Sequence, residues 1–138
     1  MTMKDLEELF YLEKLIQHEK EQLEELRSAA GLKSPVLTDM PHAPGAKDRI
    51  GEIVPKIVDQ TTEIEEHIRQ HEELRASIIR FINGIPNARI NLIFRLRFID
   101  KKHWEEIADF IGGNETGESA RKAATRYLEL EAMYSEGE

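Results

Sequence analysis

The 138-residue chain carries a formal net charge of -8, with 33% charged and only 7% aromatic residues, a composition that favours helices with solvated faces over a large compact core. It contains no cysteine, which excludes a disulfide framework and any cysteine-based zinc or redox site. No apolar run approaches the roughly 20 residues that a membrane span needs. The acidic first ten residues are unlike a signal or transit peptide, so we expect a cytoplasmic protein with no membrane partner.

The net charge conceals an uneven distribution along the chain. Residues 1–79 hold 10 Lys and Arg against 17 Asp and Glu, a balance of -7, whereas residues 80–126 hold 9 against 6, a balance of +3. A chain divided in this way can repel nucleic acid with one part and hold it with another. Composition alone is equally compatible with two sets of solvated helices.

The first predicted element is a long helix over residues 3–30. Its apolar side chains recur at alternating spacings of three and four and form a heptad stripe: Leu9, Leu12, Ile16, Leu23, Leu26 and Ala30. Glu19 occupies the one slot of this stripe that is not apolar. Gly31 follows the last apolar residue and is suited to the left-handed conformation that ends a helix.

Residues 31–46 contain three prolines and two glycines without periodicity, which predicts a loop. A second helix follows from about Asp48 to Asn83 and keeps the three-four spacing. Pro55 either lies in the first turn of a helix that begins near Val54 or kinks one that begins at Asp48, and the period of the preceding isoleucines favours the kink. The two stripes would bury each other as an antiparallel hairpin, although a second chain could complete the seam and make the arm a homodimer.

The pattern changes at Asn83-Gly84, where we place a boundary between a helical arm (residues 1–83) and a C-terminal domain (residues 84–138). Shorter apolar stretches broken by turns predict three helices there: about Pro86 to Phe98, His103 to Ile111 and Gly117 to Ala132. Pro86 suits the first helical position, and Trp104 is expected in the core. The expected fold is all-α, with a long antiparallel helical hairpin followed by a trihelical helix-turn-helix domain.

The two faces of the third helix differ in chemistry. Its small and apolar residues gather on one side: Ala120, Ala123, Ala124, Tyr127, Leu128 and Leu130. An opposite arc of about 140°, at 100° per residue, carries Arg121, Lys122, Thr125 and Arg126. A small residue at Ala108 and a glycine turn would let this helix cross the preceding one closely. That is the helix-turn-helix arrangement, whose second helix enters the major groove, where arginine reads guanine or binds phosphate.

Further candidate contacts flank this helix. Three polar side chains near its start could cap it, beside free amides that favour a phosphate oxygen: Asn114, Thr116 and Ser119. Basic side chains before the second helix could add contacts to the DNA backbone: Lys101, Lys102, Arg95 and Arg97. Because Glu115 and Glu118 weaken non-specific phosphate binding, we expect modest affinity, a steep dependence on salt, or reliance on a dimer or partner protein.

The segment LRFIDKKHWEEIADFIG (residues 96–112) resembles the region-4 helix-turn-helix of sigma factors. The continuation GGNETGESARKAATRYL (residues 112–128) is similar to a subset in small proteins of Gram-positive phages and prophages, related to late-transcription regulators of the ArpU and RinA type. This resemblance implies a sequence-specific, DNA-binding transcriptional regulator, with host RNA polymerase as a candidate partner. The turn is longer and richer in glycine than in housekeeping sigma factors, so their promoter contacts are not carried over residue by residue.

Other functions have weaker support in the sequence. His67 and His71 have the spacing of a paired zinc contact, but no HExxH motif or third ligand accompanies them, so we expect no metal or cofactor, with His71 in a core slot and His67 facing water. The sequence has neither a phosphate-binding glycine loop nor a nucleophile elbow, so we expect no enzyme. The main alternative is an interaction or assembly factor, such as a small terminase-like subunit, that acts through the arm.

Overall fold

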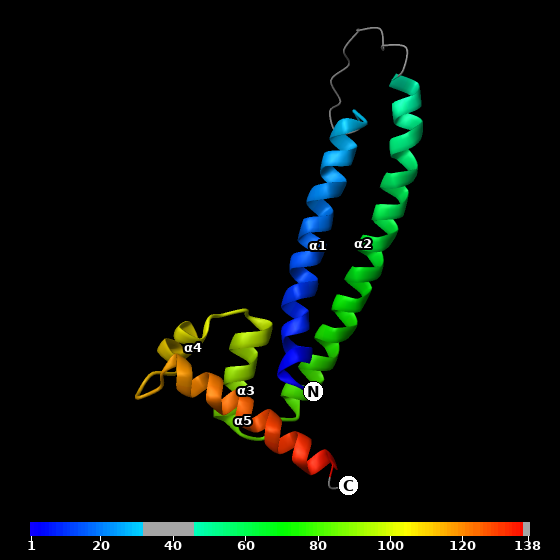
Figure 1. Ribbon diagram of the computed structural model, residues 1–138. Coiled ribbons are helices and arrows are strands. Elements are labelled where there is room, and N and C mark those ends of the chain that lie inside the picture. Colours follow the sequence, from blue (N-terminus) through cyan, green and yellow to red (C-terminus); the bar gives the residue numbers. More distant parts are fainter. Residues whose placement is uncertain (32–45, 137–138) are drawn as a thin grey trace. The chain divides into compact units, whose positions relative to one another are not determined.

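The computed structural model describes residues 1–31 and 46–136, so nearly all of the predicted loop lies outside the described residues (Figure 1). All regular secondary structure in the described part is helical, which confirms the all-α class. The elements are α1 (Met3–Ala29), α2 (Ala46–Asn83), α3 (Ala88–Phe94), the π-helical segment η1 (Arg95–Ile99), α4 (Trp104–Ile111) and α5 (Gly117–Glu136). None of these helices is long and apolar enough to cross a membrane.

The chain divides into two compact units. Residues 12–71 form the arm unit, and residues 1–11 together with 72–138 form the head unit. This division differs from the predicted boundary at Asn83-Gly84, because the first turns of α1 and the last turns of α2 supply core residues to the head. The sequence pattern could not show this, since a heptad stripe looks alike wherever its partner lies.

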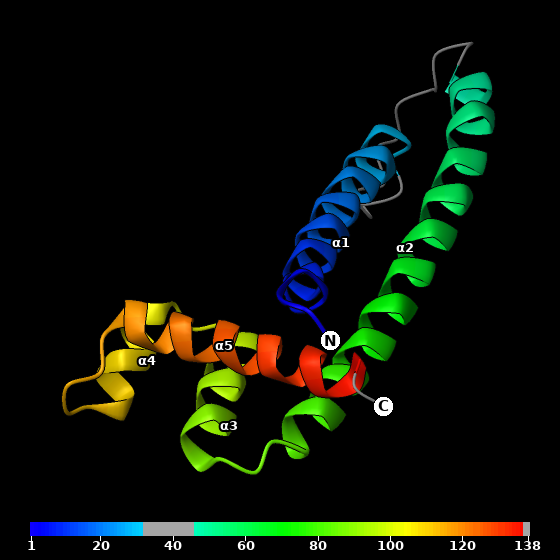
Figure 2. The same cartoon turned by 60° about the horizontal axis from the view of Figure 1, so that its bottom comes forward.

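In the arm unit α1 and α2 run antiparallel, as predicted (Figures 1 and 2). Glu13 contacts His71 and Glu19 contacts His67, so residue numbers rise on one helix as they fall on the other. Buried side chains of the two heptad stripes fill the seam: Leu12, Ile16 and Ile64. The resulting hairpin buries one narrow face of each helix.

The ends and the irregular point of the hairpin follow the local chemistry. Gly31 has a φ of 73°, the left-handed conformation expected of the residue that ends α1. Pro55 lies inside α2, which begins at Ala46. The alternative that placed this proline in the first turn is therefore wrong, because residues 46–54, about two and a half turns of helix, precede it.

The head unit is built around one core. Thirteen buried apolar side chains from all its elements form the cluster: Leu6, Leu9, Ile78, Ile82, Ile85, Ile93, Phe94, Leu96, Phe98, Ile107, Ala120, Ala124 and Leu128. Aromatic rings pack against one another within it, with the Phe94 and Phe98 centroids 5.7 Å apart and the two ring planes tilted by 41°. Trp104, which was expected in the core, is half-buried at its edge and packs edge-on against Phe98, which anchors α4 against η1.

Two features at the start of the head differ from the expectation of one helix from Pro86 to Phe98. Asn87 is the N-cap of α3, and its side chain accepts a hydrogen bond from the Ile90 amide at 3.0 Å, so the helix begins after the proline. Beyond Phe94 the backbone widens into η1, where the Asp100 amide donates to the Arg95 carbonyl. The wider turn places the side chains of η1 at angles that a regular helix period does not predict.

Candidate nucleic-acid interface

The α4–α5 pair meets through small residues. Ala108, Ala120 and Ala124 are buried, and Gly117 at the start of α5 is buried as well. A side chain at Gly117 would collide with the carboxylate of Glu105 and come within 3.2 Å of the Glu105 backbone nitrogen. The close crossing that the alanines predicted is therefore present, and Gly117 extends it to the end of the turn.

The turn between these helices uses two glycines in the left-handed region, with φ of 78° at Gly112 and 66° at Gly113. Reciprocal hydrogen bonds then fix the start of α5. The Thr116 hydroxyl accepts from the Ser119 amide at 3.0 Å, and the Ser119 hydroxyl accepts from the Thr116 amide at 2.9 Å. Two of the three polar side chains predicted to cap the helix, Thr116 and Ser119, therefore do so, whereas Asn114 stays exposed in the turn.

The predicted basic face is exposed on α5. Arg121, Lys122 and Arg126 are exposed, while Thr125 is half-buried and its hydroxyl donates to the Arg121 carbonyl at 3.0 Å. The Lys122 ammonium lies 3.1 Å from Glu118, one turn earlier, and this contact lowers the pKa of Glu118. Because both of these side chains are well exposed, a phosphate oxygen could readily take the place of the carboxylate.

Glu115 was expected from the sequence to weaken phosphate binding. In the structure its negative charge is balanced by a residue that the sequence did not suggest. The Arg89 guanidinium on α3 makes a two-pronged contact with its carboxylate, with donor–acceptor distances of 3.0 and 2.7 Å. The Ser119 hydroxyl also donates to it at 2.6 Å. These hydrogen bonds, led by Arg89, lower the pKa of Glu115, and the same contact raises the pKa of Arg89.

The basic residues before α4 divide into exposed and internal groups. Lys101 is exposed and has a left-handed φ of 60°, and Lys102 is half-buried, with its amide bonded to the Leu96 carbonyl. The expectation that Arg95 could touch DNA is not supported by its contacts, because its guanidinium donates to Asn91 and Asn83 at 2.8 and 2.6 Å. That clamp joins the end of α2 to α3.

Arg97 is also turned into the head, contrary to its predicted role beside DNA. Its guanidinium carbon lies 5.4 Å from the Phe10 ring centroid and 4.8 Å from that of Trp104, and it donates to the Lys102 carbonyl at 3.1 Å. Burial lowers the pKa of Arg97. The planar guanidinium is thus used as a stacked packing element.

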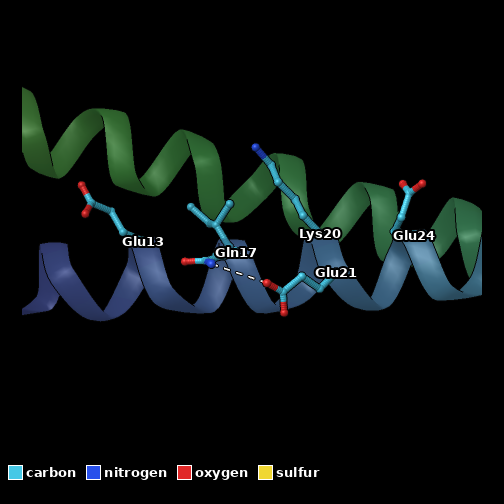
Figure 3. Close-up of a pocket in the computed structure, with 6 residues that line it drawn as sticks. Glu13, Gln17, Lys20, Glu21 and Glu24 are labelled. Atoms are coloured by element: carbon cyan, nitrogen blue, oxygen red, sulfur yellow. Dashed lines mark hydrogen bonds between the residues drawn. The ribbon is translucent and has the colours of Figure 1, made fainter.

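On the arm unit, one hollow on the surface of α1 is lined by mostly polar residues. Figure 3 shows Glu13, Gln17, Lys20, Glu21 and Glu24 following one another along the helix rather than converging on one point. The Gln17 amide donates to Glu21 at 3.4 Å. Such a row, of mixed charge, has the character of a solvated helix face.

His67 and His71 lie in the seam of the arm. His71 is half-buried opposite Glu13, and its Nε2 lies 2.9 Å from the carboxylate. His67 was expected to face water, but its Nδ1 lies 2.7 Å from Glu19, whose side chain is only 8% exposed. Glu19, the one polar residue of the heptad stripe on α1, therefore has a polar partner on α2. Within the described residues no group of three or more His, Asp or Glu side chains is arranged to hold a metal ion.

Comparisons with protein-family models, curated proteins and solved structures find no match to this chain.

Proposed function

We propose that the chain is a double-stranded DNA-binding transcriptional regulator in which α4 and α5 act as a helix-turn-helix and α5 enters the major groove. The observation that carries the proposal is the exposed basic face of α5, which follows a capped turn, while buried alanines (Ala120 and Ala124 on α5, Ala108 on α4) pack the opposite face of α5 against the head. A helix about 10–12 Å wide with its side chains fits the major groove, which is about 12 Å wide.

Each side chain then has a part that its surroundings allow. Arg121 and Arg126 are long, exposed and always charged, so they suit guanine edges or phosphates, while Lys122 suits phosphate. Thr116 and Ser119 already bond each other's amides, so they position α5 rather than contact DNA. The Arg89 contact with Glu115 removes one negative charge from the approach to the groove.

The proposed biological setting rests on the resemblance to phage late-transcription regulators. We assign the chain to a phage or prophage, with host RNA polymerase as a candidate partner and the cytoplasm as its location. The net charge of -8 opposes DNA at long range, so binding depends on local contacts and falls steeply with salt.

Fluorescence anisotropy with labelled duplexes from the gene's own neighbourhood tests the proposal across a salt series. The Arg121→Ala/Arg126→Ala variant should abolish preferential binding and make the slope of log K against log salt shallower by up to about 2. The matched control is Arg27→Ala/Arg75→Ala, which removes two exposed arginines from α1 and α2.

Equal binding by both double variants, or no binding by the wild type at low salt, would refute the DNA proposal. The competing assembly function would then gain support if substitutions on the arm surface of Figure 3 disrupted a complex while those on α5 did not.

A further inference from the structure

A shallow groove separates the start of α3 from the outer side of α5 in the head unit. Its hollow has a volume of about 490 Å³. Apolar or small side chains form its floor: Ile90, Ala123, Tyr127 and Leu130. Three cationic side chains lie around its rim: Arg89, Lys122 and Arg126. We call this feature the α3–α5 groove.

An apolar stripe leaves this groove and continues along α5. Ala123, Tyr127, Leu130 and Tyr134 fall within an arc of about 60° at 100° per residue. Leu130 is 44% exposed, and Tyr134 is 79% exposed near the end of the helix. Met133, about 60° beyond the stripe, is exposed too. Ala123 and Tyr127 are half-buried against the head core, and the exposed side chains of Leu130 and Tyr134 extend the stripe into a surface that a partner could cover.

The charges of α5 identify a partner of matching chemistry. Residues 117–126 hold three Lys or Arg and one Glu, whereas residues 127–136 hold three Glu and no Lys or Arg. This order is opposite to the one that the helix dipole favours, so the stability of the isolated helix does not explain it. Two such helices placed antiparallel bring each basic half beside an acidic half.

We infer that the α3–α5 groove binds the acidic C-terminal half of α5 from a second copy of this chain, in an antiparallel pair with a two-fold axis near Leu128 and Glu129. In this register Tyr127 lies beside Leu130 of the second copy, and Ala123 lies beside its Tyr134. Both stripes are then covered by one symmetric contact.

The two-fold axis also brings the same flank of each helix to the same side of the pair. Arg126 and Glu129 lie on that flank, about 60° apart around α5. Arg126 of one copy and Glu129 of the other differ in height by about two residues, or roughly 3 Å, and because Glu129 points about 130° from the centre of the stripe, the long arginine side chain has to reach along the flank of the pair to meet it. The pair therefore contains this ionic contact twice.

Sedimentation equilibrium of the full chain, without DNA, tests the inference from micromolar to submillimolar concentrations. We expect a monomer–dimer equilibrium in the wild type. Arg126→Glu should raise its Kd by at least about tenfold, because two attractions become two repulsions. The Arg126→Glu/Glu129→Arg variant restores opposite charges and should return most of the affinity.

Arg121→Glu is the matched control, because Arg121 is an exposed arginine on the same helix but points about 150° away from the centre of the stripe. Its Kd should stay within about twofold of the wild type. Circular dichroism and the fluorescence of Trp104, the single tryptophan, verify that each variant is folded.

A wild type that stays monomeric throughout, equal effects of Arg121→Glu and Arg126→Glu, or no recovery in the exchanged variant would each overturn the inference. A dimer that persists unchanged in Arg126→Glu would also overturn it and would move the contact to the arm. Because no DNA is present, these outcomes are separate from the success or failure of the DNA proposal.

Discussion

At the scale of single residues, the head depends on charged side chains used inside the fold. Glu115 and Arg97 both lie in a stretch that reads as a basic surface, yet each is committed to a neighbour far along the chain. Glu115 meets Arg89, 26 positions earlier, and Arg97 stacks on Phe10. The periodicity of a sequence shows only which residues share a face of one helix. It therefore could not predict these contacts between different elements.

The Arg89–Glu115 contact makes the stability of the head depend on acid. The folded-state pKa of Glu115 is lowered below the ordinary glutamate value of 4.5, so its contribution is complete above that value and is lost as the pH falls through the folded pKa. We expect Glu115→Gln to lower the unfolding free energy at pH 7 by about 1 kcal/mol. Between pH 5 and pH 3, the variant should lose less stability than the wild type.

Urea denaturation followed by Trp104 fluorescence at several pH values measures this difference. Glu72→Gln serves as a control, since Glu72 is an exposed glutamate on the part of α2 that belongs to the head unit. A wild type and a Glu115→Gln variant with parallel pH profiles would show that the carboxylate is not held by Arg89 in solution.

The stacking of Arg97 between two rings gives a second prediction at this scale. Lysine keeps the charge but lacks the planar group, so Arg97→Lys should destabilise the head by about 1–2 kcal/mol. Arg80→Lys, at an exposed position on α2, should change stability by less than about 0.5 kcal/mol. Urea midpoints from Trp104 fluorescence compare the two, and equal midpoints would contradict the stacking role.

At the scale of elements, the apolar periodicity predicted the positions of the helices better than it predicted their first residues or their type of helix. The spans of α1, α4 and α5 follow from apolar spacing together with Gly31, His103 and the glycine turn at 112–113. The π-helical turn of η1 did not follow, because it is selected by the packing of Phe98 and Leu96 in the head core. The start of α3 is set by the cap at Asn87, whereas the sequence favoured a start at the neighbouring proline.

The Glu19–His67 pair provides a prediction about the α1–α2 hairpin. Removing one partner leaves the other without its contact in the seam, so Glu19→Ala should destabilise the arm by about 1–3 kcal/mol. Replacing both, in Glu19→Leu/His67→Leu, fills two seam positions with apolar side chains and should equal or exceed wild-type stability. Glu25→Ala, at an exposed site, should have little effect.

Thermal unfolding of the full chain by circular dichroism measures these three variants, with Trp104 fluorescence separating the melting of the head. A double variant less stable than Glu19→Ala would mean that the polar pair stabilises the hairpin more than apolar packing does.

At the scale of the whole molecule, the two proposals share side chains on α5 and so constrain each other. Lys122 and Arg126 belong both to the face proposed for DNA and to the rim of the α3–α5 groove. Antiparallel α5 helices in contact would lie about 8–10 Å apart, whereas recognition helices in successive major grooves are about 34 Å apart. One pair therefore cannot hold itself together through α5 and read two half-sites, and DNA should compete with self-association.

Leu130→Ser tests this competition, because it weakens the apolar stripe without changing any charge. We expect it to raise the dimer Kd by about tenfold, the loss of roughly 1.4 kcal/mol of apolar contact for each pair, and to leave the DNA affinity of the dilute protein unchanged. At high protein concentration, the apparent DNA affinity of the wild type should fall below the affinity of the dilute protein, whereas that of the variant should stay unchanged.

Phe110→Ser, which removes an exposed apolar side chain from α4, should behave as the wild type. DNA affinity that does not vary with self-association would show that the two surfaces are independent, and α5 would then contact DNA through Arg121 and Thr125 alone.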